Sequence, residues 1–162
     1  MCLFFKKPKT KDVQQYFYRE WKNTEMPGFP PKSSRNYENF KQSPYDTLNK
    51  TYCSASMKVK CGKWDLDYKV AYNRKENKVY LSVWYFNLTL PGADLQRAVN
   101  QTFKNYKIGY WPSAVTITSK DYTVKKISDI ENAFHDIVRE WKESGIYNFM
   151  DNFKTNEELK KK

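Results

Sequence analysis

The chain has 162 residues, a formal net charge of +11 at pH 7 and a mean hydropathy of -0.90. An apolar content of 40% excludes a wholly disordered chain, and the length suffices for one domain with its own core. No apolar run approaches the roughly 18 residues of a membrane-spanning helix. We therefore predict a soluble single domain over residues 1–162, without membrane insertion.

The positive charge is concentrated in residues 1–126, whereas residues 127–162 carry slightly more acidic than basic side chains. Such a basic field attracts phosphate backbones, anionic membranes or acidic proteins without choosing among them. Residues 1–5 form an apolar start that is too short for a signal peptide, and lysines follow it instead of preceding it. The cysteines are odd in number and lack zinc-ligand spacing, so we expect a cytoplasmic protein with no metal and no cofactor.

Thr10 is the predicted N-cap of a first helix over residues 10–22, where apolar side chains repeat at helical spacing. These side chains are Val13, Tyr16, Phe17 and Trp21. Prolines and aromatic residues follow, so we predict a long connection over residues 23–51 with a short helical turn near residues 35–41.

From Tyr52 the apolar residues alternate with polar ones, which predicts two half-buried strands. The first ends at Cys61 and the second begins at Trp64, with Gly62 and Lys63 between them. A two-residue hairpin loop at Gly62 and Lys63 puts Cys61 opposite Trp64, with the other apolar pairs on the same face.

The same register places Lys60 opposite Asp65 and Lys58 opposite Asp67 on the second face of the hairpin. Two carboxylates separated by a single residue are also a pattern for metal binding or for acid–base catalysis. Because each carboxylate faces a lysine, we interpret both as solvent-side ion pairs.

A third strand is predicted from residue 78 to about residue 90, with Val79, Leu81, Val83 and Tyr85 on the core face. Its second face is also apolar, and it holds Tyr80, Ser82, Trp84, Phe86 and Leu88. A strand that is apolar on both faces is normally covered on both. The cover is either the first helix or the proline-rich connection, or it is a partner.

Beyond this strand we predict a helix over residues 93–106 and a short hairpin that runs from Val115 to Val124. A capping box from Ser128 to Glu131 opens a last helix, which Gly145 closes. Its outer face carries an acidic stripe of Asp129, Asp136, Glu140 and Glu143. Residues 146–162 are predicted to be a loosely held tail.

The predicted fold is α+β: helix, three-strand antiparallel meander, helix, two-strand hairpin, helix. Over residues 10–144 this element order resembles the type III secretion chaperones and the YbjN-like domains that are similar to them. The resemblance implies a non-enzymatic protein binder, and it transfers the role of no individual residue.

The sequence contains no GxxxxGK[ST], GxGxxG, HExxH or GxSxG motif, and we predict that the protein is not an enzyme. The single histidine, His135, lies on the flank of the last helix, where we interpret it as a bystander. A Cys/His dyad with Cys53 or Cys61 stays open, because spatial adjacency is invisible in a sequence.

The leading functional prediction is a protein-interaction module, accessory or chaperone-like. Its predicted partner-binding residues are Tyr37, Phe40, Tyr45, Tyr80, Trp84, Phe86 and Trp111. The alternative is nonspecific nucleic-acid binding through exposed aromatics and a basic surface. Its predicted phosphate contacts are Lys6, Lys7, Lys9, Lys11, Lys104, Lys107, Lys125 and Lys126. The bias toward Lys, Asn and Tyr is typical of an AT-rich genome, as in a virus or mobile element.

Overall fold

The computed structural model describes residues 6–35, 46–61, 64–86, 93–111 and 114–153. It has an α+β fold with one antiparallel sheet of six strands. Five of them lie in the order β1-β2-β3-β5-β4, and the sixth, β6, pairs with β3. The strands are β1 (Tyr52–Cys61), β2 (Trp64–Asn73), β3 (Lys78–Phe86), β4 (Lys107–Trp111), β5 (Ala114–Thr118) and β6 (Tyr122–Thr123). The helices are α1 (Thr10–Asn23), η1 (Lys32–Ser34), α2 (Ala93–Thr102), α3 (Ile127–Ser144) and α4 (Ile146–Asn152). None of these described helices is long and apolar enough to cross a membrane.

The three-strand meander has the register that the alternation predicts. Cys61 pairs with Trp64 and Lys58 with Asp67 across the first hairpin, and Asp67 in turn pairs with Trp84 of β3. The core face of these strands is almost fully buried, and its members include Cys53, Val59, Leu66, Val70, Leu81 and Val83. The loop at residues 62–63 and the predicted continuation of β3 to residue 90 lie outside the described residues.

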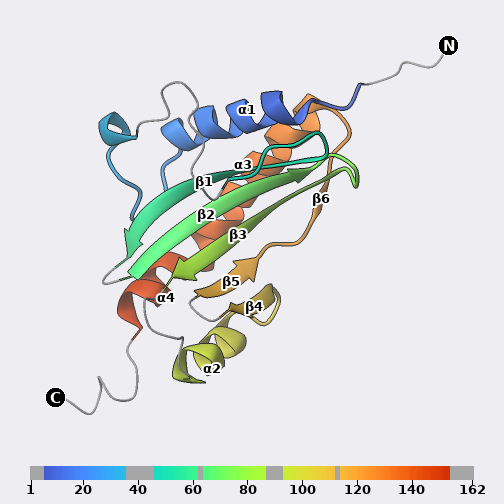
Figure 1. The fold of residues 1–162 in the computed structure, drawn as a ribbon. Coiled ribbons are helices and arrows are strands. Elements are labelled where there is room, and N and C mark those ends of the chain that lie inside the picture. Colours follow the sequence, from blue (N-terminus) through green and yellow to red (C-terminus); the bar gives the residue numbers. More distant parts are fainter. Residues whose placement is uncertain (1–5, 36–45, 62–63, 87–92, 112–113, 154–162) are drawn as a thin grey trace.

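Helix α3 packs on the core face of the sheet, and α1 lies along the edge strand β1 and against α3 (Figure 1). Trp21 of α1 is fully buried, and its Nε1 donates a hydrogen bond to the carbonyl of Ala55 over 3.0 Å. Its indole also meets the ring of Phe134 at a centroid distance of 5.1 Å. The first helix therefore does not cover the second face of β3, and the interpretation of α1 as that cover is wrong.

The connection after α1 folds back onto the core side of the sheet. Phe29 meets Tyr68 edge to face, with ring centroids 5.3 Å apart. Arg35 is buried, and its guanidinium donates to the carbonyls of Thr24 and Pro30 at 2.5 and 2.8 Å. The helical turn expected near residues 35–41 is found earlier, as η1. Residues 36–45 lie outside the described part of the chain.

The N-caps of both long helices differ from the prediction. Lys9 is the N-cap of α1, while the hydroxyl of Thr10 donates to the carbonyl of Asn49 instead of capping the helix. Helix α3 begins at Ile127, and the carboxylate of Asp129 accepts the backbone N–H groups that precede it. The short Asp129 side chain reaches these donors from the third helical position, so Glu131 does not form the predicted box.

The second hairpin and the C-terminal segment also differ from the prediction. Strands β4 and β5 form the hairpin, whereas β6 leaves β5 and pairs with β3 through Tyr122 and Val79. Helix α2 ends at Thr102, because the following residues turn into β4. In place of a loose tail, α4 buries Ile146 and Met150 almost completely. The described part of this segment is therefore part of the core.

Candidate functional site

The candidate site is the sheet face opposite α3, which we call the open face. No described helix lies on this face, which points toward the viewer in Figure 1. Its rows follow from the strand register, with side chains at alternate positions of each strand. The row at its centre contains Lys58, Asp67, Trp84, Thr116 and Gly109.

Two tryptophans stack on the open face. The indole rings of Trp84 and Trp111 lie 5.8 Å apart between centroids and 20° from parallel. The ammonium of Lys69 lies 5.2 Å from the centroid of Trp84, within the range of a cation–π contact. Trp84 is half-buried between these neighbours, whereas Trp111 keeps 53% of its surface exposed. The stack therefore ends in an indole that is open to an incoming group.

Gly109 makes room for the hydroxyl of Thr116, which lies beside the exposed indole. A Cβ atom at this position would lie 2.6 Å from Oγ1 of Thr116 and 3.4 Å from Nε1 of Trp111. A Cβ atom would thus collide with the hydroxyl of Thr116, whereas 3.4 Å from the indole is ordinary van der Waals contact. The indole Nε1 of Trp111 lies 3.5 Å from Thr116 Oγ1, so the threonine hydroxyl helps to orient the ring.

Asp67 belongs to the open face but is buried, so the interpretation of its carboxylate as part of a solvent-side ion pair is wrong. Only 3% of its surface is exposed, and its Oδ1 has no hydrogen-bond partner among the described residues. Burial raises the pKa of this carboxyl to about 6, although Lys58 and Lys69 act in the opposite direction. Asp65 is exposed as expected. Asp67 differs in its position at the centre of the sheet, where its register neighbours are Lys58 and Trp84.

The structure brings together only some of the predicted partner-binding residues. Trp84 and Trp111 meet, whereas Tyr80 lies four positions away along β3, with its hydroxyl 3.3 Å from that of Tyr52. Phe86 pairs with Asp65 in the register, and its side chain lies outside the described part. Tyr37, Phe40 and Tyr45 also lie outside the described residues.

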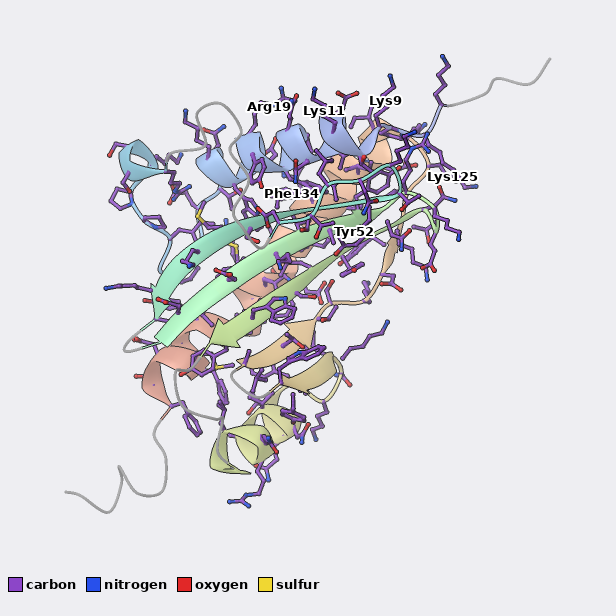
Figure 2. The ribbon with its side chains drawn as sticks, in the orientation of Figure 1. Lys9, Lys11, Arg19, Tyr52, Lys125 and Phe134 are labelled. Atoms are coloured by element: carbon purple, nitrogen blue, oxygen red, sulfur yellow. The ribbon has the colours of Figure 1, made fainter. Side chains whose placement is uncertain are left out.

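Most of the predicted phosphate contacts gather at the end of the molecule where α1 and α3 begin. Figure 2 labels Lys9, Lys11 and Lys125 at this end. Lys104 and Lys107 are separate from it, since Lys104 follows α2 and Lys107 opens β4, where its Nζ lies 3.8 Å from a carboxylate oxygen of Asp121. The other described lysines of the predicted set, Lys6, Lys7 and Lys126, are exposed.

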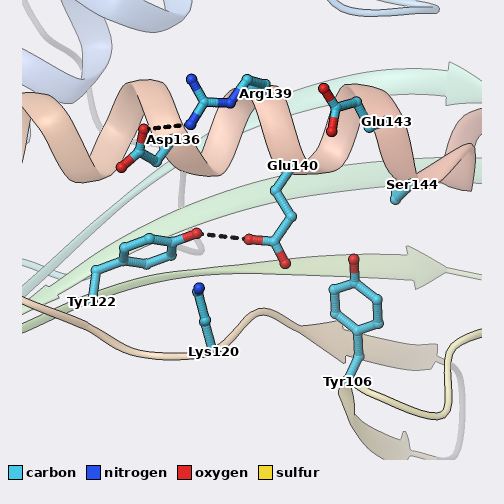
Figure 3. Close-up of a pocket in the computed structure, with 8 residues that line it drawn as sticks. All are labelled: Tyr106, Lys120, Tyr122, Asp136, Arg139, Glu140, Glu143 and Ser144. Carbon is cyan, nitrogen blue, oxygen red and sulfur yellow. Dashed lines mark hydrogen bonds and ion pairs between the residues drawn. The ribbon is translucent and has the colours of Figure 1, made fainter.

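A cavity of about 420 Å³ lies between α3 and the segment that leads into β6 (Figure 3). The hydroxyl of Tyr122 donates to Glu140 over 2.8 Å, and Arg139 pairs with Asp136 at 2.8 Å. The predicted acidic stripe thus lines this cavity in part. Burial raises the pKa of Tyr122, which keeps its hydroxyl protonated. Among the described residues, no group of three or more His, Cys, Asp or Glu could hold a metal ion.

The two described cysteines lie in the core. Burial raises the pKa of Cys53 and of Cys61 to about 12, so both remain thiols at neutral pH. Cys61 Sγ lies 3.5 Å from the carbonyl oxygen of Tyr147. His135 is exposed on α3, and its ring lies edge-on to Phe134 at a centroid distance of 6.1 Å. The possible dyad gains no support from these positions.

Comparison of the chain with protein-family models, with curated proteins and with solved structures gives no significant match. A proposal for the function of this chain must therefore rest on the fold and on the geometry of the open face.

Proposed function

We propose that this protein is a non-enzymatic protein-interaction module that holds a partner on the open face of its sheet. The exposed indole of Trp111, stacked on Trp84, is the observation that carries the proposal. Exposed aromatic side chains that are already oriented lose little conformational entropy on binding, and they are frequent hot spots of interfaces.

The surroundings of the tryptophan pair fit the rim of a protein interface. Ser82 and Thr118 share a hydrogen bond of 2.9 Å in the neighbouring row, and Thr116 lies beneath the stack. An apolar centre with a rim of hydroxyl and charged groups is the usual anatomy of such an interface. The partner that fits is a protein segment with an aromatic or aliphatic side chain that extends the stack.

The charges of the open face favour a protein over a nucleic acid. Lys58 and Lys60 each stand opposite a carboxylate, and Lys69 lies over the ring of Trp84. The carboxylates of Asp65 and Asp67 would repel phosphates placed beside the tryptophans. A binding platform for single-stranded nucleic acid instead combines its aromatics with an excess of cations.

The element order adds support by analogy. One helix, a three-strand meander, a helix and a hairpin precede the last long helix, as in the secretion chaperones that the chain resembles. Proteins of that fold act as protein binders without catalysis, so the analogy is with the type of function and not with any residue.

Selection of peptides from a random phage-displayed library tests the proposal. The full-length protein is the bait, and each selected peptide is then measured against the wild type and the Trp111→Ala variant. We expect peptides with aromatic or aliphatic anchors whose affinity falls at least about tenfold in Trp111→Ala, as for an interface hot spot. A library that yields no Trp111-dependent peptide would overturn the proposal.

The matched control is Tyr110→Ala. Tyr110 is the neighbour of Trp111 on β4 and is 39% exposed, but it points to the other side of the sheet and donates to the carbonyl of Gln96. This variant should bind the selected peptides like the wild type. Both variants should unfold within about 1 kcal/mol of the wild type, since surface side chains contribute little to stability.

A further inference from the structure

A second cavity, far richer in positive charge, lies at the start of α1. It has a volume of about 360 Å³, and its lining consists of Lys9, Thr10, Lys11, Lys50 and Arg74. Four of these side chains are cationic at neutral pH and none is acidic. They come from three separate segments of the chain: the start of α1, the residues before β1 and the turn after β2.

Hydrogen bonds between the three segments hold this cavity in shape. Arg74 Nε donates to the carbonyl of Pro8 over 3.1 Å, and Thr10 Oγ1 donates to the carbonyl of Asn49 over 2.5 Å. Lys7 Nζ donates to the carbonyl of Arg74 over 3.3 Å. These hydrogen bonds hold together the three segments that carry the cations, so the basic residues are brought to one place by the fold.

The positive charge continues beyond the cavity toward α3. The N–H of Val124 donates to the carbonyl of Asn77 over 2.9 Å, which fixes the start of α3 against the turn that carries Arg74. Lys125 follows Val124 directly, and Figure 2 draws it at the same end of the molecule as Lys9. The carboxylate of Asp129 is engaged by backbone N–H groups at this point.

Within the described part of the chain, no carboxylate forms an ion pair with a cation of the cavity. Among the described residues, the ion pairs involve Lys32, Lys78, Lys107 and Arg139, and none of them includes a cation of the cavity lining. Like charges that converge without a counter-charge repel one another, so an anion that binds among them is strongly favoured.

We propose that this cavity and the adjacent start of α3 bind the phosphate groups of a nucleic-acid backbone. Lysine and arginine side chains and a threonine hydroxyl are the usual donors to phosphodiester oxygens. The cations extend from the cavity past the turn to Lys125, which suits consecutive phosphates of one strand. Recognition would be independent of base sequence, because these residues offer contacts to the backbone alone.

The recessed shape of the site favours nucleic acid over the other source of clustered phosphates, an anionic membrane. A bilayer presents its headgroups to a flat or protruding surface, whereas these basic residues line a cavity into which a single strand can place a phosphate. This inference is independent of the proposed function, since the open face and the cavity share no residue.

Fluorescence anisotropy with labelled single-stranded DNA of about 20 nucleotides, measured over a series of salt concentrations, tests the proposal. The wild type should bind at low salt, with an affinity that falls steeply as salt rises. The Lys9→Gln, Lys11→Gln, Lys50→Gln triple variant should bind at least about tenfold more weakly. The slope of log affinity against log salt should be shallower by about 2, because each lost phosphate contact contributes about 0.7.

The matched control is the Lys58→Gln, Lys60→Gln, Lys107→Gln triple variant, which loses the same charge from the open face. It should retain affinity within about twofold and keep the salt slope of the wild type. Equal losses in the two triple variants, or no binding of DNA at low salt, would overturn the proposal. So would binding to vesicles of phosphatidylcholine and phosphatidylserine by a protein that does not bind the DNA.

Discussion

Phe17 of α1 stacks on Phe134 of α3, with ring centroids 5.8 Å apart and ring planes 25° from parallel. Trp21 meets the same ring edge-on, and both residues of α1 are fully buried. This cluster joins the first helix to the last long helix across more than one hundred residues of sequence. It is the reason that α1 lies at the edge of the sheet and leaves the tryptophans of the open face uncovered.

The Phe134→Ala variant should lose about 3–5 kcal/mol of unfolding free energy, because the truncation leaves a cavity among three aromatic rings. His135→Ala is the control, since this neighbouring side chain is exposed and should change stability by less than about 0.5 kcal/mol. Urea denaturation followed by circular dichroism measures both values. Similar losses in the two variants would contradict the packing of α1 on α3 through Phe134.

The hairpin between β1 and β2 could be predicted residue by residue, whereas the place of α1 could not. The alternation from Cys53 to Cys61 and from Trp64 to Tyr72 allows one register around a two-residue loop, because any slip would turn charged side chains inward. The helical repeat of Val13, Phe17 and Trp21 shows that one face of α1 is buried. The repeat carries no information on which surface buries that face. The prediction that α1 covers the second face of β3 was wrong for this reason.

The candidate site shows the same division. The sequence predicts that Trp84 lies on the second face of its strand, but the stack on Trp111 depends on the pairing of β5 between their strands. The sequence does not predict that pairing, because its alternation places the hairpin loop after Ile117, whereas the loop between β4 and β5 lies before Val115. The one local signal for it is Gly109, which fits a strand position where a large side chain lies across the backbone.

A double-mutant cycle at Lys58 and Asp67 tests the register of the open face. The Lys58→Glu change puts a second carboxylate opposite a buried one, so it should destabilise the fold by about 1 kcal/mol. Combination with Asp67→Lys restores opposite charges and should recover part of the loss. Lys60→Glu is the control, because its partner Asp65 is exposed and water screens the repulsion. An absence of coupling between Lys58 and Asp67 would contradict their contact.

The Asp67→Asn variant should be more stable than the wild type at pH 7. Burial raises the pKa of Asp67 from 3.8 to about 6 in the fold, so the folded state binds a proton more tightly than the unfolded chain. The stability of the wild type therefore falls as the pH rises from about 4 to about 6, as this carboxyl ionises inside the protein.

Asparagine has the same shape and does not ionise, so the variant should show no such fall at this position. The gain at pH 7 should be about 1–3 kcal/mol, the upper value being the free energy that corresponds to the change in pKa. Near pH 3.5 the two proteins should be equally stable. Denaturant titrations at several pH values measure the difference, and a difference that does not vary with pH would rule out ionisation of Asp67 as its cause.

Two glycines with left-handed backbones give a matched pair of substitutions. Gly28 has a φ of 81° and Gly145 a φ of 71°, so alanine is strained at both positions. A Cβ atom at Gly145 has nothing within 4 Å, whereas a Cβ atom at Gly28 would overlap the ring of Tyr147 on α4. Gly145→Ala should thus cost about 1 kcal/mol, and Gly28→Ala should cost at least about 2 kcal/mol.

The difference between the two variants measures the packing of the proline-rich connection on α4. In a Tyr147→Ala background the overlap is gone, so Gly28→Ala should cost about 1 kcal/mol there, the same as Gly145→Ala. Urea denaturation of the four single and double variants measures this coupling. If Gly28→Ala costs the same with and without the Tyr147 ring, the connection does not pack on α4 at this position, and strain of the backbone alone accounts for the loss.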